Sequence, residues 1–379
     1  MTHLFELYFF RGYFKYMQEN YKKQQDFKLF STFNRWVIFM NKENEIANLM
    51  ENFIRKGTWK AGSKIPSEYE LSEMYQINRK TANKAVAKLE EKGLIFRTKG
   101  RGGSKVALEL PPRGVIAYRL PLLSAGTFSS QLLKGAQAAA RAANFDLKYF
   151  EYEIPEEKHW MKIACSGICG ALYTACNPPP EDFPYPAINA ANEIGTNFVA
   201  SDDVDGGRQA AELFLANGHR NVAIICDNYL SNKQGRITGF IQTMIDNGIP
   251  FKEEFFFSIP QNNEINIRAL WESLVPLKIT GAFCYSDTIA MHLALHITSL
   301  GLKIPQDFSI CGYGNMQLFN HVMPLTTVRQ FPETIGYTAC TKLIELIENP
   351  QNTPIQICSP VELINPRQSV AENPNKKNI

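Results

Sequence analysis

The sequence lacks the short motifs that mark many hydrolases and nucleotide-binding enzymes. Its 379 residues hold no H-E-x-x-H, no G-x-x-x-x-G-K-[ST] and no G-x-S-x-G. The eight cysteines form no C-x-x-C pair, and Cys226, Cys284 and Cys311 lie inside apolar runs, as buried thiols do in a reducing cytoplasm. No stretch approaches the apolar length of a membrane helix. We therefore expect no enzyme activity, no catalytic residues, no metal site, no cofactor and no membrane partner.

Net charge is also small, but it is unevenly distributed. The whole chain carries +3, whereas the segment from Arg79 to Lys105 holds nine Lys or Arg against Glu90 and Glu91. Residues 111–379 carry an excess of acidic side chains. A cationic segment attached to a mildly acidic body is typical of a DNA-reading domain rather than of a general polyanion binder.

The cationic segment follows a helix-turn-helix pattern and ends in a basic, glycine-rich hairpin tip. After Pro66, Ser67 is a typical start for one helix, and a second helix is predicted from about Arg79 to Lys92. Gly93 is expected to end it. The second helix would bury one apolar face, made of Ala82, Ala85, Val86 and Leu89. These features together predict a winged helix-turn-helix.

The order GTWKAGSKIPSE, NRKTANKAVAKLEEKGLI and RTKGRGG resembles the DNA-binding domain of GntR-type bacterial transcription regulators. The resemblance implies DNA contacts from the residue after Pro-Ser-Glu, the start of the second helix and the wing tip. Members usually carry Arg where this chain has Tyr69 and Asn83, so the resemblance does not give the operator sequence; Asn pairs well with adenine. The predicted DNA-binding residues are Ser67, Tyr69, Arg79, Lys80, Thr81, Asn83, Lys84, Lys99, Arg101 and Gly102.

From about Arg113 to Val370, apolar runs alternate with helical patterns. Examples of predicted strands are RGVIAYRLPLL, NVAIICD and DFSICGYG; predicted helices include SSQLLKGAQAAARAANF and DTIAMHLALHITSLG. This alternation predicts an α/β fold with doubly wound parallel sheets, and its length suggests two lobes. In such sheets a ligand binds outside the carboxyl ends of the strands.

The same region resembles the effector domain of LacI and GalR-type repressors, which is similar to periplasmic binding proteins. Its landmarks are DDVDGGRQAAELFLANGHRNVAIIC, RITGF, AFCYSDTIAMHLALHITSLGLKIPQDFSICGYGN, PLTTVRQFPETIGYTACTKLIELI and PRQS. Arg236 matches the family's sugar-binding Arg, and Phe128 is placed to stack on a sugar. Asp287 is expected either to accept from a ligand or only to cap its helix. Gly314 stands where an Asp is usual, which points to Asn315 or to a different site. The predicted effector-binding residues are Phe128, Arg236, Tyr285, Ser286, Asp287 and Asn315.

The predicted domains are a winged helix-turn-helix at 41–108, a linker at 109–113, a LacI-like domain at 114–370 and a polar tail at 371–379. Residues 1–40 form an aromatic extension with three interpretations: sequence upstream of a true start at Met40, a packing or dimerising arm, or a membrane-surface anchor.

A chain that combines a GntR-like DNA-binding domain with a LacI-like effector domain resembles arabinose-responsive repressors, which have the same two domains. We therefore expect a cytoplasmic, homodimeric, ligand-responsive transcription regulator that represses a carbohydrate-utilisation operon. Its partners would be double-stranded operator DNA and a small effector, a sugar or sugar derivative. The alternative is a cytoplasmic sugar-binding module without an operator switch.

Overall fold

The computed structural model describes residues 42–98, 102–121, 127–151, 156–227, 234–259, 267–316, 323–350 and 353–373. The predicted aromatic extension lies outside the described residues, as does most of the predicted polar tail. The chain divides into two compact units between Pro111 and Pro112. This division falls inside the segment predicted as a linker, while the other predicted domain bounds remain predictions.

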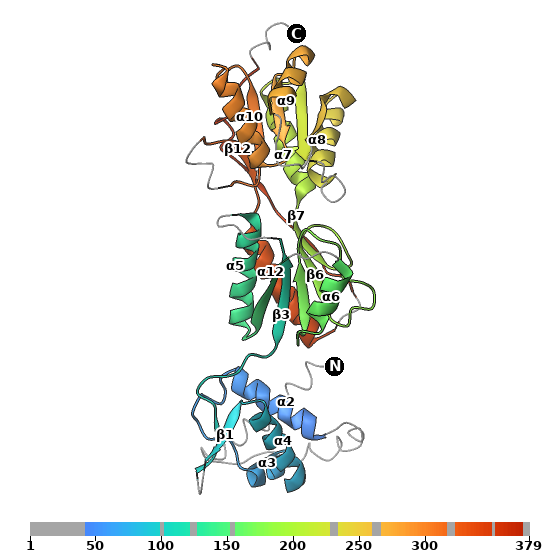
Figure 1. The fold of residues 1–379 in the computed structure, drawn as a ribbon. Helices are drawn as coiled ribbons and strands as arrows, with labels where there is room; N and C mark the ends of the chain where they lie inside the picture. Colours follow the sequence, from blue (N-terminus) through green and yellow to red (C-terminus); the bar gives the residue numbers. More distant parts are fainter. Residues whose placement is uncertain are drawn as a thin grey trace. The chain divides into compact units, whose positions relative to one another are not determined.

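The N-terminal unit consists of helices and one hairpin (Figure 1). In chain order its elements are α2 (Lys42–Arg55), α3 (Glu68–Met74), α4 (Arg79–Glu91), β1 (Ile95–Thr98) and β2 (Gly103–Val106). The strands of the hairpin pair antiparallel, with Ile95 opposite Val106 and Thr98 opposite Gly103. The unit therefore has the predicted helix-turn-helix and wing.

Capping side chains explain where the two helices of the motif begin. Ser67 caps α3 in a reciprocal capping box: its hydroxyl accepts from the backbone N–H of Glu70, whose carboxylate accepts from the Ser67 N–H at 2.7 Å. Asn78 caps α4 by accepting from the Thr81 N–H at 2.7 Å. Gly93 follows α4 with a φ of +68°, which glycine adopts without strain. These local signals are the ones on which the prediction of both helices rested.

The core of this unit lies between its helices and the hairpin. The predicted apolar face of α4 is buried, and Leu71 and Met50 are fully covered. Ion pairs join α2 to α4 at the surface, because Glu43 accepts from Lys84 and Lys88 at 2.9 Å each and Glu51 accepts from Lys92 at 2.6 Å. The cations of α4 therefore serve in part to hold α2.

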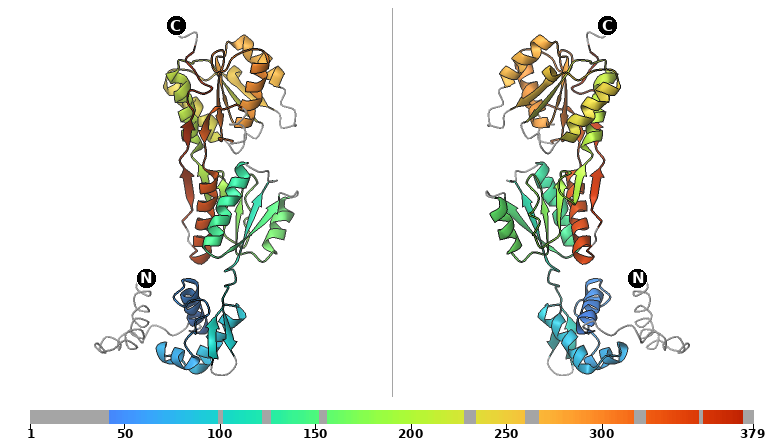
Figure 2. Two further views of the ribbon diagram at one scale, coloured as in Figure 1. Left: turned by 90° about the vertical axis from the view of Figure 1, so that its left-hand side faces the viewer. Right: turned by 90° about the vertical axis from the view of Figure 1, so that its right-hand side faces the viewer.

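The C-terminal unit contains two six-stranded sheets, one in each lobe (Figures 1 and 2). The strand order in lobe 1 is β13-β7-β6-β5-β3-β4, and all its pairs are parallel. The elements of lobe 1 are β3 (Val115–Leu120), α5 (Phe128–Ala142), β4 (Asp146–Glu151), α6 (Glu156–Ala164), β5 (Gly170–Tyr173), β6 (Ala187–Ala191), β7 (Phe198–Ser201), α12 (Pro332–Glu348) and β13 (Gln356–Ser359).

Lobe 2 has the order β14-β12-β11-β10-β8-β9, in which only the β12–β14 pair is antiparallel. Its helices and strands are α7 (Asp203–Ala216), β8 (Val222–Asp227), α8 (Gln234–Asp246), η3 (Glu253–Phe255), β9 (Phe256–Ile259), α9 (Ile267–Leu274), η4 (Val275–Leu277), β10 (Gly281–Cys284), α10 (Asp287–Ser299), β11 (Ser309–Tyr313), β12 (Thr326–Arg329) and β14 (Glu362–Ile364). The predicted α/β fold with two doubly wound sheets is confirmed.

The described chain passes between the lobes three times. It crosses from β7 to α7, returns from β12 to α12, and crosses again from β13 to β14. Because β7 and β12 each leave their parallel sheet at the carboxyl end, the carboxyl ends of both sheets face the opposite lobe. The crossings therefore border the place where a ligand is expected in an α/β fold.

Each lobe packs one pair of helices through closely approaching backbones. A Cβ on Gly135 of α5 would collide with the Glu333 carbonyl of α12, and one on Gly336 of α12 would collide with the Leu132 carbonyl of α5. In lobe 2, Gly207 of α7 and Gly239 of α8 stand in the same reciprocal relation. Gly207 thus faces helix α8, whereas its neighbour Gly206 faces Tyr313 of the sheet.

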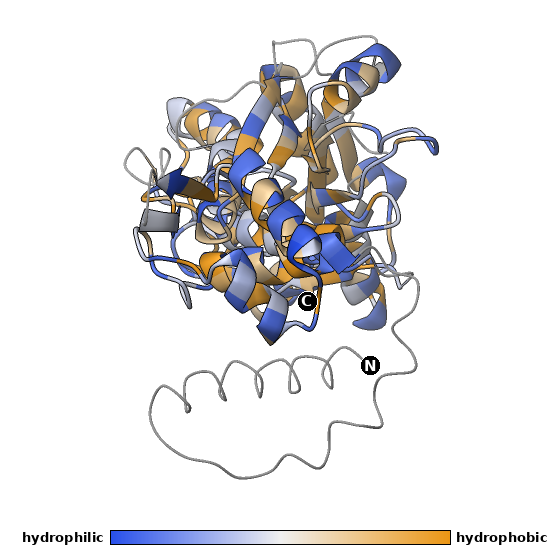
Figure 3. Ribbon diagram, turned by 90° about the horizontal axis from the view of Figure 1, so that it is seen from below, coloured by the Kyte–Doolittle hydropathy of each residue, from blue (hydrophilic) through white to orange (hydrophobic). Residues whose placement is uncertain are grey.

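The helices carry hydrophilic and hydrophobic residues on different sides (Figure 3). The strands are covered on both faces: in β3, Ile116 and Tyr118 pack with α5 and α12, while Ala117 packs with Trp160 of α6. This double burial explains the continuous apolar runs in the sequence. Among the described residues, no helix has the length and apolar character needed to span a membrane.

Candidate functional site

The N-terminal residues of α4 form an exposed polar surface. Arg79, Lys80 and Asn83 are exposed, and the described residues include no ion-pair partner for Arg79 or Lys80. Thr81 is partly buried, and its hydroxyl donates to the capping Asn78 side chain at 3.0 Å. These two exposed cations at the start of a helix are therefore well placed to reach DNA phosphates or base edges.

Other predicted DNA-binding residues have partners inside the unit. Lys84 is bound to Glu43, and Ser67 is engaged in the cap of α3. Gly102 lies next to the hairpin, where a Cβ would collide with Thr98. Lys99 and Arg101 lie outside the described residues. Their roles at a DNA interface remain predictions.

Tyr69 projects from α3 and is 61% exposed. A hydrogen bond with Glu73, four residues along the same helix, raises the pKa of the Tyr69 hydroxyl. The side chain presents an aromatic face where the resemblance would place Arg. It can stack or make an apolar contact but supplies no bidentate cationic fork.

The predicted effector residues of lobe 2 gather at the ends of β10 and β11. Arg236, near the start of α8, donates from Nε to Asp203 Oδ2 at 2.9 Å and from Nη1 to the Tyr285 carbonyl at 2.9 Å. Its guanidinium lies 3.8 Å from the ring centre of Tyr313 and 4.5 Å from that of Tyr285. Burial lowers the pKa of Arg236, but Asp203 outweighs burial and the pKa is raised. The predicted sugar donor is thus held by protein groups.

Ser286, and not Asp287, caps α10, because its hydroxyl accepts from the Ile289 N–H. The alternative that Asp287 only caps its helix is wrong. Asp287 accepts from the Thr327 hydroxyl at 2.6 Å and from the Met316 N–H at 2.7 Å, and burial raises its pKa. It fixes the segment after β11, where Asn315 adopts a left-handed φ of +54°.

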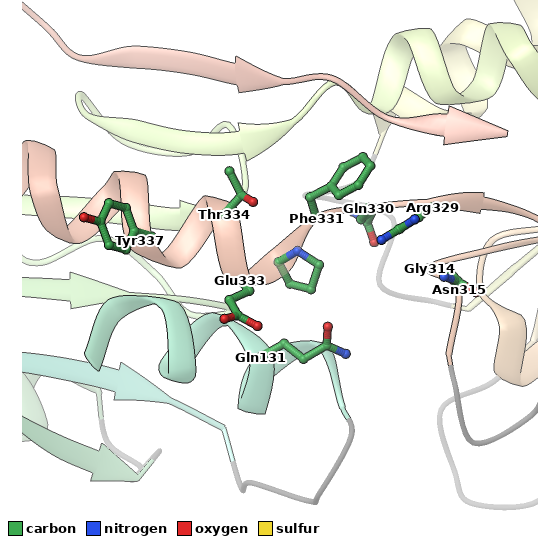
Figure 4. Close-up of a pocket in the computed structure, with 10 residues that line it drawn as sticks. Gln131, Gly314, Asn315, Arg329, Gln330, Phe331, Glu333, Thr334 and Tyr337 are labelled. Atoms are coloured by element: carbon green, nitrogen blue, oxygen red, sulfur yellow. The ribbon is translucent and has the colours of Figure 1, made fainter. Parts of the chain in front are cut away.

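A cavity of about 490 Å³ lies where β12 crosses into α12 (Figure 4). Gly314 and Asn315 of lobe 2 lie across from Gln131 and Glu333 of lobe 1. The remaining lining residues are Arg329, Gln330, Phe331, Pro332, Thr334 and Tyr337. Of the predicted effector residues, only Asn315 lines this cavity. Phe128 begins α5 and packs against the core of lobe 1.

The lining suits a small, highly polar ligand. Its amide and hydroxyl groups can both donate and accept hydrogen bonds, and they belong to Gln131, Asn315, Gln330 and Thr334. Phe331 supplies an apolar ring. Arg329 stacks over Phe331 with 4.7 Å to the ring centre, and Glu333 pairs with Lys134 at 2.8 Å. Neighbouring hydroxyls of a polyol need this mixture of planar donors and acceptors.

The comparisons with known proteins agree with this division of the chain. Residues 42–104 match the family of bacterial regulatory proteins named gntR, and residues 211–370 match the periplasmic binding protein-like domain. This chain joins a GntR-type DNA-binding domain to a periplasmic-binding-protein-like domain. The GntR-type match runs from α2 into β2 of the wing, and the other match runs from within α7 through the rest of lobe 2, including the return through α12 and β13.

Individual relatives share this character. The arabinose metabolism transcriptional repressor of Geobacillus stearothermophilus is 25% identical over 325 residues, which cover 78% of this chain and 88% of that one. The probable transcriptional repressor ExuR of Bacillus subtilis is 29% identical over 170 residues, 44% of this chain and 51% of ExuR. The chain therefore spans only about half of ExuR.

Among solved structures, the complex of the transcriptional regulator CelR with cellobiose aligns with a TM-score of 0.60 at 17% identity, over 80% of this chain and all of that one. This likeness shows the fold. The GntR-type domain and these relatives make the protein a DNA-binding transcription regulator, in agreement with the sequence-based expectation. The relatives named are regulators and not enzymes.

Sequence reasoning missed most of the cavity and the partner of Arg236. Asp203 and Gln330 both lie in landmark segments of the LacI-type resemblance, which assigns neither of them a role at the site. A local signal is present, since Pro332 stands at the start of α12, where proline is favoured. That signal locates a crossing but does not reveal which side chains meet there.

Proposed function

We propose that this protein represses genes of carbohydrate use and that a sugar or sugar derivative, bound between the lobes, changes its affinity for operator DNA. The observation that carries the proposal is the polar cavity at the β12–α12 crossing, in a chain that also holds a GntR-type domain. A ligand placed there touches both lobes and the segment that joins them. Its binding energy can therefore favour one arrangement of the lobes.

The relatives support a sugar as the ligand class. The printed name of one relative refers to arabinose metabolism, and one structure of the same fold holds cellobiose. The effector site we propose includes Gln131, Asn315, Gln330 and Thr334 of the cavity. Asp287 holds the backbone N–H of Met316, the neighbour of Asn315. Direct effector contacts by Phe128, Arg236, Tyr285 and Ser286 remain predictions.

The DNA-binding proposal centres on Arg79, Lys80 and Asn83 of α4, with Tyr69, Thr81 and the wing beside them. A single recognition helix makes few base contacts, so we propose that a homodimer reads inverted half-sites in the cytoplasm. Selection of duplexes from a random library by the full chain should yield an inverted repeat. A single unrepeated site, together with a monomer in sedimentation, would remove the dimer from this proposal.

The effector proposal is tested with the selected operator. Fluorescence anisotropy of labelled operator should show an affinity change of about 5- to 150-fold on adding the right sugar, with arabinose, galacturonate and cellobiose as first probes. DNA binding that no sugar alters would contradict the effector role. Sugar binding by calorimetry without operator binding would instead favour a sugar-binding module.

A further inference from the structure

One partly buried carboxylate ties two of the lobe crossings to lobe 2. Asp203 stands directly after the β7 crossing and accepts from Ser201 Oγ at 2.7 Å, from Tyr313 Oη at 2.9 Å and from Arg236 Nε at 2.9 Å. Gln330, on the β12 crossing, donates from Nε2 to Ser201 Oγ at 2.6 Å and more weakly to Asp203 at 3.4 Å. We call these five residues the Asp203 cluster: Ser201, Asp203, Arg236, Tyr313 and Gln330.

The hydrogen bonds of the Asp203 cluster run in one direction. The Gln330 amide donates to the Ser201 oxygen, and the Ser201 hydroxyl donates its proton to Asp203. The ion pair with Arg236 and the bond from Tyr313 fix Asp203 on the lobe 2 side. Ser201, by contrast, is the last residue of a lobe 1 strand. Rotation at the β7 crossing must therefore break or rearrange the contacts made through Ser201.

Gln330 connects this cluster to the cavity. The residue is only 6% exposed, yet it lines the cavity together with Gly314 and Asn315, which directly follow Tyr313 in the chain (Figure 4). The Gln330 amide has two N–H groups, of which one is given to Ser201 and the other only weakly, at 3.4 Å, to Asp203. A ligand oxygen that takes a Gln330 N–H would therefore compete with Ser201 or Asp203.

We propose that Gln330 is the positioning residue through which an occupant of the cavity acts on the lobe crossings, by way of Ser201 and Asp203. This inference rests on the proposed function, because it presumes an occupant that changes operator affinity. Gln330 and the other cavity residues then have different tasks. Residues such as Thr334 determine the affinity for the ligand, whereas Gln330 determines how strongly ligand binding changes the contacts at the lobe crossings.

The test replaces Gln330 by Met in the full chain, which keeps the length of the side chain and removes its amide. Thr334→Val is the matched control, because Thr334 lines the same cavity from α12 and takes no part in the Asp203 cluster. Arabinose is the first probe, and its affinity is measured by calorimetry with and without operator. The ratio of the two affinities is the coupling factor, about 5 to 150 in a typical allosteric protein.

Gln330→Met should reduce this ratio toward one, whereas Thr334→Val should weaken sugar binding and keep the ratio. An unchanged ratio in Gln330→Met would overturn the inference. If the unmodified chain responds to no sugar, the proposed function fails, and a second readout still decides the role of Gln330.

That second readout is hydrogen exchange of residues 199–206 without sugar. The Asp202 N–H donates across to the Ser359 carbonyl of the third crossing at 2.8 Å, so its exchange reports how firmly the crossings are held. Gln330→Met should speed exchange in this segment, and Thr334→Val should not. Equal exchange in Gln330→Met and the unmodified chain would show that the amide does not hold the crossings.

Discussion

Arg236 and Asp203 form an ion pair in which Nε lies 2.9 Å from Oδ2 and the side chains are only 12% and 18% exposed. An arginine that a family resemblance assigns to a ligand here pairs with a carboxylate at a lobe crossing. Replacing Arg236 by Met leaves Asp203 buried without its cation. Removal of one partner of such a pair costs about 3–5 kcal/mol of stability.

Chemical unfolding measures this loss. The control is Arg208→Ala in α7, whose ion pairs with Asp205 and Glu212 are exposed and should contribute at most about 1 kcal/mol. Adding Asp203→Asn to Arg236→Met should cost less than the sum of the single changes, because the charge left behind is then removed. Additive costs would show that the two charges do not depend on each other.

The second prediction separates two lysines of α4. Lys80 is exposed without an ion-pair partner among the described residues, while Lys88 is bound to Glu43 and to Asn44. Lys80→Ala should lower the slope of log affinity against log salt by about 0.9, the value for one phosphate contact. Lys88→Ala should leave the slope unchanged, as measured by anisotropy over a series of salt concentrations.

Arg79→Ala should differ from both lysine changes. If Arg79 reads a base edge, its loss costs about 1–3 kcal/mol on the selected operator and relaxes sequence preference. Equal weakening on operator and on random duplex would make Arg79 a phosphate contact instead.

The third prediction concerns pH. His219 bonds through Nδ1 to the Thr280 hydroxyl and through Nε2 to the Ala371 carbonyl, and burial lowers its pKa below the usual 6.5. A histidine with a lowered pKa in the fold favours folding while it is neutral, so its contribution is present above pH 6.5 and is lost as the pH falls below that value. The melting temperature should therefore fall between pH 7.5 and about 5.5.

His219→Gln should flatten this dependence, although it lowers stability at neutral pH. His292→Gln removes an exposed ring on α10 and should preserve it. A pH profile that is the same in all three proteins would assign the acid sensitivity to other groups.

The fourth prediction uses the paired glycines. In an open helix, Gly→Ala stabilises by about 0.5–1 kcal/mol because Ala loses less backbone entropy. At Gly336 the new methyl meets the Leu132 carbonyl, so Gly336→Ala should destabilise by about 1–3 kcal/mol. Glu345→Ala, at an exposed position of the same helix, should change stability by less than about 0.5 kcal/mol. Stabilisation by Gly336→Ala would mean that α5 and α12 do not approach each other so closely.

The sequence allowed the fold to be predicted because its signals are local. Ser67 and Asn78 mark helix starts through capping hydrogen bonds to residues three positions away, and Gly93 marks a helix end through its positive φ. Strands buried on both faces appear as unbroken apolar runs. The cavity gives no such signal. Gln330 and Gln131 are far apart in the chain, and neither residue type is distinctive by itself.

Arg236 illustrates the limit most clearly. Its place at the start of a helix can be predicted from the sequence. Whether its guanidinium faces a ligand or a carboxylate depends on Asp203, which lies 33 residues earlier in the chain. Of the six predicted effector residues, the fold therefore gathers only those near the ends of β10 and β11.

The threading of the chain between the lobes also orders events during synthesis. Residues 42–111 contain every element that the structure describes in the DNA-binding unit, so these elements can fold as soon as they leave the ribosome. Lobe 1 lacks a core helix until α12 is made and an edge strand until β13 is made, and lobe 2 still awaits β14. A chain that stops before α12 would thus retain a folded reader of DNA while neither lobe could be completed, and it could not answer to an effector.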